Sequence, residues 1–268
     1  MVRVVSLACS NTEIVCALGH AAALVGVDDH SDWPPEVVGA LPRVGPDLAV
    51  DVAAVAALEP DLVLASLTVP GHERVVEAVE RAGLPFLAPE PVDLAGVLAS
   101  VREIAGALGD PPAGEALVAE MERGWAIATP PERRPSVLVQ WWPRPVIAPG
   151  GASWVRELVE RAGGRSPLAH EPVKSRPLDD AEVAALALDA IVLSWCGVEP
   201  DKVREDVVYR NPAWQGLAAV RDRRVYRIPE AYLGRPSPRL IEGYRRLCAV
   251  VSAVAPAPSS EKASASSS

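Results

Sequence analysis

Cysteine, methionine and phenylalanine are scarce in this chain of 268 residues, which contains four, two and one of them. The cysteines (Cys9, Cys16, Cys196, Cys248) show no Cys-x-x-Cys spacing. This argues against a zinc cluster and against a thioredoxin-type redox motif. We expect all four to be buried thiols outside any disulfide.

Basic residues are outnumbered, and long apolar runs are missing. The chain has 26 Lys and Arg residues against 35 Asp and Glu residues, so its formal net charge is −9. Nucleic acids and anionic membranes attract basic surfaces, so neither is expected to be the main partner. No apolar run reaches the ~18 residues of a membrane-spanning helix. Without a Gly-x-Ser-x-Gly motif or a glycine-rich phosphate loop, no catalytic set and no cofactor are predicted.

No signal peptide is expected in the sequence as written, because its first residues already have the pattern of a strand. We therefore expect a cytoplasmic protein as written. If a leader is missing, we expect an extracytoplasmic protein, either periplasmic or on the cell surface.

One stretch of the chain occurs twice. Residues 55–66 and residues 183–194, 128 positions later, agree at six of twelve positions. Each copy has a short helical pattern, a break before an Asp, and an apolar run ending in Ser, which is typical of a helix leading into a buried parallel strand. A repeat at half the chain length predicts two similar α/β lobes, with a small-molecule cleft between them.

Apolar patterning predicts alternating strands and helices in both lobes, and therefore parallel sheets covered on both faces. The first-lobe strands are expected at 2–7, 24–27, 62–65 and 85–87, and the helices at 12–18, 50–58 and 72–82. The second-lobe strands are expected at 136–140, 190–194 and 225–228, and the helices at 153–162, 180–186, 212–217 and 238–254. Asn11, Thr12 and Glu13 have the chemistry to cap the first helix.

The predicted fold is α/β, with two Rossmann-like lobes whose parallel sheets are joined by a long rigid helix. We predict an N-terminal lobe at 1–95, a connecting helical region at 96–129, a C-terminal lobe at 130–254 and a disordered tail at 255–268, rich in Ser and Ala. The connecting region is broken once, at Gly109-Asp110-Pro111-Pro112, where proline ends one helix and starts the next. A stiff connector restricts the lobes to small rotations.

Seven of the twelve aromatic residues are Trp, and several follow predicted strands. Trp33 follows a first-lobe strand, and Trp141, Trp142 and Trp195 follow second-lobe strands. Ligands of open parallel sheets bind outside the carboxyl ends of the strands, so we expect these rings in the cleft. A core role for one or two of them stays open.

Polar candidates occur at the same strand ends. They are His30, Ser66, Thr68, Arg144, Lys174, Arg176, Cys196, Tyr232 and Arg235. Arginine opposite aromatic rings favours carboxylate, phosphate or phenolate ligands. His30 and Cys196 belong to different lobes and do not make a closed metal site, so no metal is predicted.

Several segments together resemble the helical-backbone (class III) periplasmic solute-binding proteins, the family that delivers cobalamin and ferric siderophores to ABC importers. They are residues 6–13, 25–27, 31–35, 41–45, 59–63, 150–164 and 236–239. The resemblance covers roughly residues 2 to 252. It is closest to the cobalamin-binding branch, through Ser31-Asp32-Trp33-Pro34-Pro35 and Ser194-Trp195-Cys196-Gly197.

The resemblance implies a receptor rather than an enzyme, with cobalamin or a ferric chelate as its ligand. The expected ligand contacts are His30, Trp33, Ser66, Trp141, Trp142, Arg176, Trp195, Cys196, Tyr232 and Arg235. The chain departs from the cobalamin binders at His30, where they have an aromatic residue, and near Asp47, Ser66 and Ser175, where further aromatic residues are missing.

The resemblance also implies docking on an ABC permease and its ATPase, through one surface Glu in each lobe, and a monomeric receptor. Glu73 matches the first docking position. The second falls at Gly234, and the nearby Glu230 is a substitute.

Two alternatives stay open. One is a cytoplasmic enzyme that handles a corrinoid or metal chelate, with His30 as its proton acceptor. The other is a sensor or scaffold that keeps the binding fold without transport.

Overall fold

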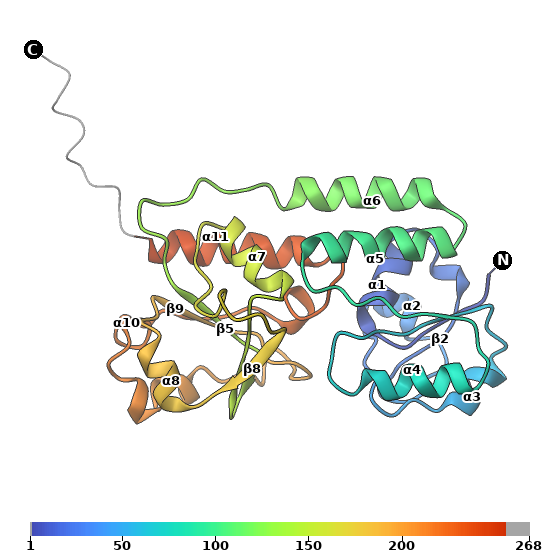
Figure 1. Ribbon diagram of the computed structural model, residues 1–268, viewed down its shortest axis with the longest axis horizontal. Coiled ribbons are helices and arrows are strands. Elements are labelled where there is room, and N and C mark those ends of the chain that lie inside the picture. The colour runs from blue at the N-terminus through green and yellow to red at the C-terminus, as the bar shows by residue number, and fades with distance from the viewer. Residues whose placement is uncertain (1, 256–268) are drawn as a thin grey trace, which may run out of the picture. The chain divides into compact units, whose positions relative to one another are not determined.

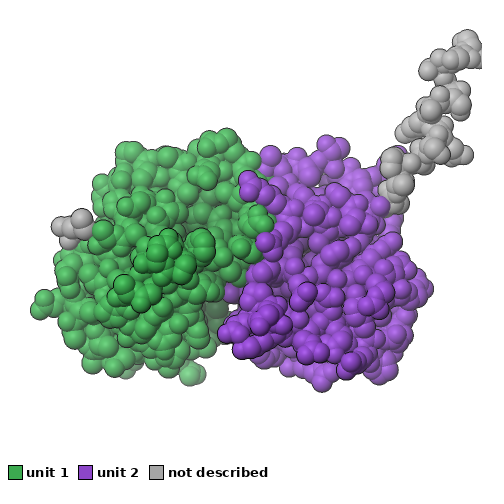
Figure 2. Space-filling view, turned by 180° about the vertical axis from the view of Figure 1, so that it is seen from behind, with its two compact units in different colours: residues 1–125, 231–242 green, residues 126–230, 243–268 purple. Residues whose placement is uncertain are grey.

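The computed structural model describes residues 2–255, which divide into two compact units (Figure 2). Of the described residues, unit 1 comprises 2–125 and 231–242, and unit 2 comprises 126–230 and 243–255. The predicted disordered tail lies outside the described residues, except for Ala255. No helix within residues 2–255 has the length and apolarity needed to cross a membrane.

Unit 1 contains a four-stranded parallel sheet in the order β2-β1-β3-β4. Its strands are β1 (Val4–Ser6), β2 (Leu24–Val27), β3 (Leu62–Leu64) and β4 (Phe86–Leu87). One face is covered by α3 (Val52–Ala57) and α4 (His72–Arg81), and the other by α1 (Cys9–Ala17) and α5 (Leu94–Ala107) (Figure 1). Val5 and Val63 of the sheet pack with Val55 of α3 and Val79 of α4. The predicted parallel α/β arrangement is confirmed here.

The first helix begins earlier than the capping pattern predicted. α1 starts at Cys9, so Asn11, Thr12 and Glu13 lie inside the helix and are buried instead of capping it. Asn11 Nδ2 donates to the carbonyl of Ala65, at 2.7 Å. These polar side chains therefore bond to distant parts of the unit, a role that the local sequence pattern does not indicate.

The helical region after residue 93 forms two helices, α5 and α6 (Pro111–Gly124), which lie side by side (Figure 1). The predicted break is confirmed: Asp110 caps α6, and its Oδ1 accepts from the N–H of Ala113 at 3.2 Å. Both helices belong to unit 1. The two helical segments predicted on either side of the break are thus α5 and α6, and they pack against each other within unit 1.

Unit 2 contains a three-stranded parallel sheet in the order β10-β9-β5. Its strands are β5 (Val137–Gln140), β9 (Ala190–Leu193) and β10 (Val225–Arg227). Short helices contribute to the core on one side, namely α8 (Asp180–Ala185), α9 (Asp206–Tyr209) and α10 (Ala218–Arg221). On the other side lie α7 (Trp154–Arg161) and the unit 2 part of α11 (Leu240–Val254) (Figure 1).

A second sheet in unit 2 was not predicted from the sequence. It is antiparallel, in the order β6-β7-β8, and consists of β6 (Trp142–Pro143), β7 (Val146–Pro149) and β8 (Ser175–Leu178). The predicted helix at 212–217 is also shorter than expected, because only a 3₁₀ turn forms at Pro212–Trp214.

The repeated stretch takes the same place in both units. Its two copies end in β3 and β9, and each of these strands pairs with the first strand of its unit. The Asp that begins each apolar run binds the residue just before the neighbouring strand: Asp61 accepts from the N–H of Arg3 and Asp189 from that of Ser136, both at 2.8 Å. The repeat therefore corresponds to one structural module used twice.

Candidate functional site

In unit 1, a hydrogen-bond network holds the loops that follow the parallel strands. Asp28, the first residue after β2, is buried and accepts from the hydroxyl of Ser31. The Ser31 hydroxyl lies 2.9 Å from that of Thr12, which donates to Ser6 at 2.8 Å. Burial raises the pKa of the Asp28 carboxyl, against hydrogen bonds that lower it. The network fixes the loop that carries His30.

His30 presents an accessible imidazole, 56% exposed, with Nε2 3.7 Å from Asp47 Oδ1. The buried His72 lies on the other side of the carboxylate, with Nε2 3.3 Å from Asp47 Oδ2. Because the backbone N–H of Val69 donates to His72 Nδ1, Nε2 of His72 carries the hydrogen and donates to Asp47. This hydrogen bond is the main reason that the pKa of Asp47 is lowered, and burial opposes it. Val69 and Leu48 add exposed apolar surface beside this cluster.

The segment 231–242 returns to unit 1 and binds the buried Glu13. Glu13 Oε1 is 3.0 Å from Nη1 of Arg235 and from Nη1 of Arg239, and the carboxyl accepts from the hydroxyl of Ser237. Arg235 also pairs with Asp32 at 2.5 Å. Burial raises the pKa of Glu13, against the opposing effects of Arg235, Ser237 and Arg239. Arg235, a predicted ligand contact, therefore already has two carboxylate partners.

Two predicted aromatic contacts lie beside the same segment. The guanidinium of Arg239 is 4.8 Å from the centroid of the Trp33 ring and 4.9 Å from that of Tyr232, which is cation–π geometry. Trp33 stays half-exposed. Ser66, by contrast, is buried, and its hydroxyl lies 2.9 Å from that of Thr68.

In unit 2, three buried polar atoms at the carboxyl edge of the parallel sheet have no hydrogen-bond partner within residues 2–255. They are Gln140 Nε2, Trp141 Nε1 and Ser194 Oγ. The indole N–H of Trp195 donates to Gln140 Oε1 at 3.3 Å, and since an indole can only donate, this contact fixes the amide orientation. Buried polar atoms without protein partners are places where water or a ligand is expected to bind.

The remaining unit 2 candidates differ in how accessible they are. Trp142 is 42% exposed, and the Trp141 ring lies 6.4 Å from that of Trp154, centroid to centroid. Arg176 pairs with Glu171 and with Glu182, at 2.5 and 2.7 Å, and these partners raise its pKa. Like Arg235, it is committed to carboxylates of the protein.

The cysteines form no disulfide in the described part of the chain. Cys196 is exposed, and Cys9, Cys16 and Cys248 are half-buried, so the expectation of four buried thiols was wrong. Among residues 2–255, no group of three or more His, Cys, Asp or Glu side chains is arranged to hold a metal ion.

The predicted contacts divide equally between the units. Unit 1 has His30, Trp33, Ser66, Tyr232 and Arg235, and unit 2 has Trp141, Trp142, Arg176, Trp195 and Cys196. Of the two proposed docking residues, Glu73 is exposed at the start of α4, and Glu230 begins the short 3₁₀ turn Glu230–Tyr232.

Sequence reasoning missed Asp47, His72, Glu13 and Gln140. His72 and Glu13 stand in helical patterns, and Asp47 in a polar loop, with no local sign that they share contacts with residues far along the chain. Gln140 is the last residue of an otherwise apolar strand. A polar side chain at that strand end was the sequence signal that could have identified it.

Comparisons with known proteins agree on one family. The model of the periplasmic binding protein family matches residues 4–232. The ABC transporter substrate-binding lipoprotein YvrC of Bacillus subtilis is 29% identical over 256 residues, covering 91% of this chain and 78% of that protein. The vitamin B12-binding protein of Pectobacterium carotovorum is 26% identical over 265 residues, which cover 97% of this chain and 92% of that protein.

A solved structure gives the same result. The periplasmic haem-binding protein RhuT from Roseiflexus, in its apo form, matches with a TM-score of 0.79 and 26% identity over 95% of this chain and 99% of that one. Because the family model covers most of the chain and the whole fold agrees, this protein belongs to the periplasmic binding protein family of solute receptors.

Proposed function

We propose that the protein is the solute receptor of an ABC importer and that its ligand is a metal tetrapyrrole, either a corrinoid such as cobalamin or a haem. Similar proteins support this class, since they include a vitamin B12-binding protein and a haem-binding protein. Both are binding proteins, so the enzymatic alternative is not favoured. A receptor of this family acts outside the cytoplasmic membrane, and we propose the same place for this chain.

The observation that carries the proposal is the accessible imidazole of His30. A flat metal chelate needs an apolar surface for its ring and a donor atom for its metal, and histidine is a common axial ligand of haem iron. Asp47 stands behind His30, as carboxylates often stand behind metal-binding histidines. Leu48, next to Asp47, and Val69, whose N–H donates to His72, supply exposed apolar surface.

Unit 2 offers complementary chemistry at its sheet edge. The exposed ring of Trp142 provides a flat apolar surface, and the unpartnered Trp141 N–H and Ser194 hydroxyl can bond to amide or carboxylate groups at the rim of a tetrapyrrole. Arg176 and Arg235 support the protein scaffold instead, because their donors already bind carboxylates. In the importer, we propose Glu73 and Glu230 as the charges that meet the permease.

A titration with two tetrapyrroles tests this function. We expect haemin, followed by its absorption spectrum, or cyanocobalamin and aquocobalamin, followed by calorimetry, to bind one to one with a Kd near or below about 1 μM. His30→Ala should change the visible spectrum of the bound metal and weaken binding about tenfold or more, since an axial ligand is lost.

The matched control is His170→Ala, because His170 is a still more exposed histidine, in unit 2, with its Nε2 4.0 Å from Glu171 Oε1. It should bind like the parent. Failure of both tetrapyrroles to bind would reject the ligand class. Normal affinity and an unchanged spectrum in His30→Ala would reject the role of His30 while keeping the receptor.

A further inference from the structure

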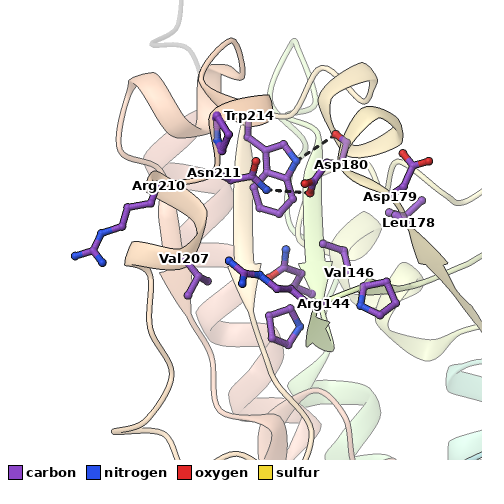
Figure 3. A pocket seen from close by; sticks show the side chains of 13 residues that line it. Arg144, Val146, Leu178, Asp179, Asp180, Val207, Arg210, Asn211 and Trp214 are labelled. Atoms are coloured by element: carbon purple, nitrogen blue, oxygen red, sulfur yellow. Dashed lines mark hydrogen bonds between the residues drawn. The ribbon is translucent and has the colours of Figure 1, made fainter.

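Unit 2 contains a cavity of about 370 Å³ that the proposed function does not use. It lies between the turn joining β6 to β7, the start of α8, and the segment from α9 to Trp214 (Figure 3). Its volume falls within the range of small-molecule sites, which is roughly 300 to 1,000 Å³. Every lining residue belongs to unit 2, so the cavity is complete within that unit.

Gln140 gives this cavity a buried hydrogen-bond donor. Gln140 lines the cavity, is 1% exposed, and has an Nε2 without a partner among residues 2–255. Its Oε1 is already occupied by the indole N–H of Trp195. The unpartnered group of this amide is therefore its N–H.

Arg144 adds a positive charge to the same cavity. Its guanidinium lies within the group of lining side chains, whereas that of Arg210 extends away from them (Figure 3). Within residues 2–255, Arg144 forms no hydrogen bond or ion pair, while Arg210 pairs with Asp206 at 3.3 Å. An uncommitted guanidinium next to a free amide N–H favours an anionic acceptor, above all a carboxylate.

The remaining walls are partly apolar and partly polar. Asp179 and Asp180 also line the cavity, and the Asp179 carboxylate accepts from the backbone N–H of Glu182 at 2.8 Å. Val146, Leu178 and Val207 line the cavity together with the ring of Trp214 and three prolines. The polar edge of Trp214 is already used, since its Nε1 donates to the carbonyl of Asp180 at 3.2 Å, and the Asp180 carboxylate accepts from Asn211. Only the apolar body of the indole is left for a ligand.

From these contacts we infer that unit 2 has a second ligand site, for a small monocarboxylate with an aromatic or apolar body. The carboxylate bonds to Arg144 and to Gln140 Nε2, and the body packs against Trp214, Val146 and Leu178. This inference goes beyond the solute site, because it uses none of the residues assigned to the tetrapyrrole.

Phenylacetate is a suitable probe, with phenylacetamide as its neutral counterpart. Titrations of the tetrapyrrole-free protein, followed by calorimetry and saturation-transfer NMR, should show saturable binding of phenylacetate and about tenfold weaker binding of the amide, as expected when a charge-assisted hydrogen bond is lost. Arg144→Gln should weaken phenylacetate binding by about the same factor. Because Arg144 is exposed, we expect the Arg144→Gln variant to fold normally, so weaker binding would not result from a folding defect.

Arg210→Gln is the matched control, because it removes the same charge from the same rim but from a side chain that points away. It should change phenylacetate affinity less than about twofold. The site is rejected if phenylacetate shows no saturable binding, if phenylacetamide binds equally well, or if both arginine variants lose the same affinity. Because no tetrapyrrole is present, these outcomes are independent of the proposed solute.

Discussion

Glu59 and Ala187 occupy equivalent places in the two copies of the repeat, and both have left-handed backbone, with φ of 48° and 45°. This conformation costs roughly 1 to 2 kcal/mol for a residue with a Cβ. Each reverses the chain between a helix and the Asp that opens the next strand. The two copies differ in sequence at this position but share its geometry, so the backbone, and not the side chain, is what the repeat preserves.

The environments of Cys16 and Cys196 predict different thiol reactivity. Burial, with the charges of Glu13 and Glu36, raises the pKa of Cys16 to about 11. At about pH 8, only roughly one Cys16 in a thousand is then the reactive thiolate. Cys196 is exposed, so we expect it to react first with a disulfide reagent such as DTNB.

Stopped-flow labelling of single-cysteine replacements checks this order. Cys196→Ser should remove the fastest phase, and Cys16→Ser should leave it unchanged. If the fast phase persists without Cys196, or if Cys16 is labelled at the same speed, the assignment of burial to Cys16 is wrong.

Close packing between α5 and α6 depends on one glycine. A Cβ added at Gly114 would lie 2.6 Å from the Cβ of Ala105, which is buried, so one helix must shift to accept it. We expect Gly114→Ala to destabilise unit 1 by about 1 to 3 kcal/mol, the usual cost of overpacking.

Gly106→Ala is the matched control on the same helix pair, because an added Cβ there meets nothing within 4 Å. It should stabilise the helix by about 0.5 to 1 kcal/mol, since alanine restricts the unfolded chain. Urea unfolding followed by circular dichroism measures both. Equal effects of the two variants would show that α5 and α6 are not packed as closely as described.

The regular elements were predictable where burial was continuous. The apolar runs that became β3 and β9 have an Asp before them and a Ser after them, and the strands end within one residue of prediction. The antiparallel sheet was not predictable, because β6 and β8 are short and contain Pro143 and Pro177, which are unfavourable in strands.

The candidate site was predictable only in part, because local pattern does not indicate contacts between residues far apart in the sequence. His30 follows a strand, and strand ends are identifiable from local pattern. Asp47 and His72 are 25 residues apart, so their contact is created by the tertiary fold. Arg176 and Arg235 were expected to meet a ligand because they stand at the same strand ends as the Trp residues. In the fold, each of them also pairs with carboxylates of the protein, which local pattern does not indicate.

The longest-range contacts within unit 1 tie its two chain segments together. Arg235, Ser237 and Arg239 bind Glu13 across 222, 224 and 226 residues of sequence. Unit 1 is therefore complete only after the chain has formed residues 126–230 of unit 2 and returned. Formation of the Glu13 cluster should accordingly be a late event in folding, coupled to closure of a very long loop.

The charge of Glu13 also predicts how stability depends on pH. Burial raises its folded-state pKa above the ordinary value of 4.5, so between these two values the folded chain keeps a proton that the unfolded chain has released. The contribution of Glu13 to the free energy of unfolding is then largest below about pH 4.5, falls as pH rises through the folded-state pKa, and is constant above it.

Glu13→Gln removes this titration, so the stability of the variant should improve relative to the parent as pH rises from about 4.5. Urea unfolding across pH measures the difference, with the exposed Glu103→Gln on α5 as a control that should show no such trend. The opposite result, in which the parent becomes more stable relative to the variant as pH rises, would mean that Arg235 and Arg239 lower the pKa of Glu13 more than burial raises it. The sign of this one slope therefore distinguishes a cluster held by ion pairs from one in which the buried carboxyl keeps its proton.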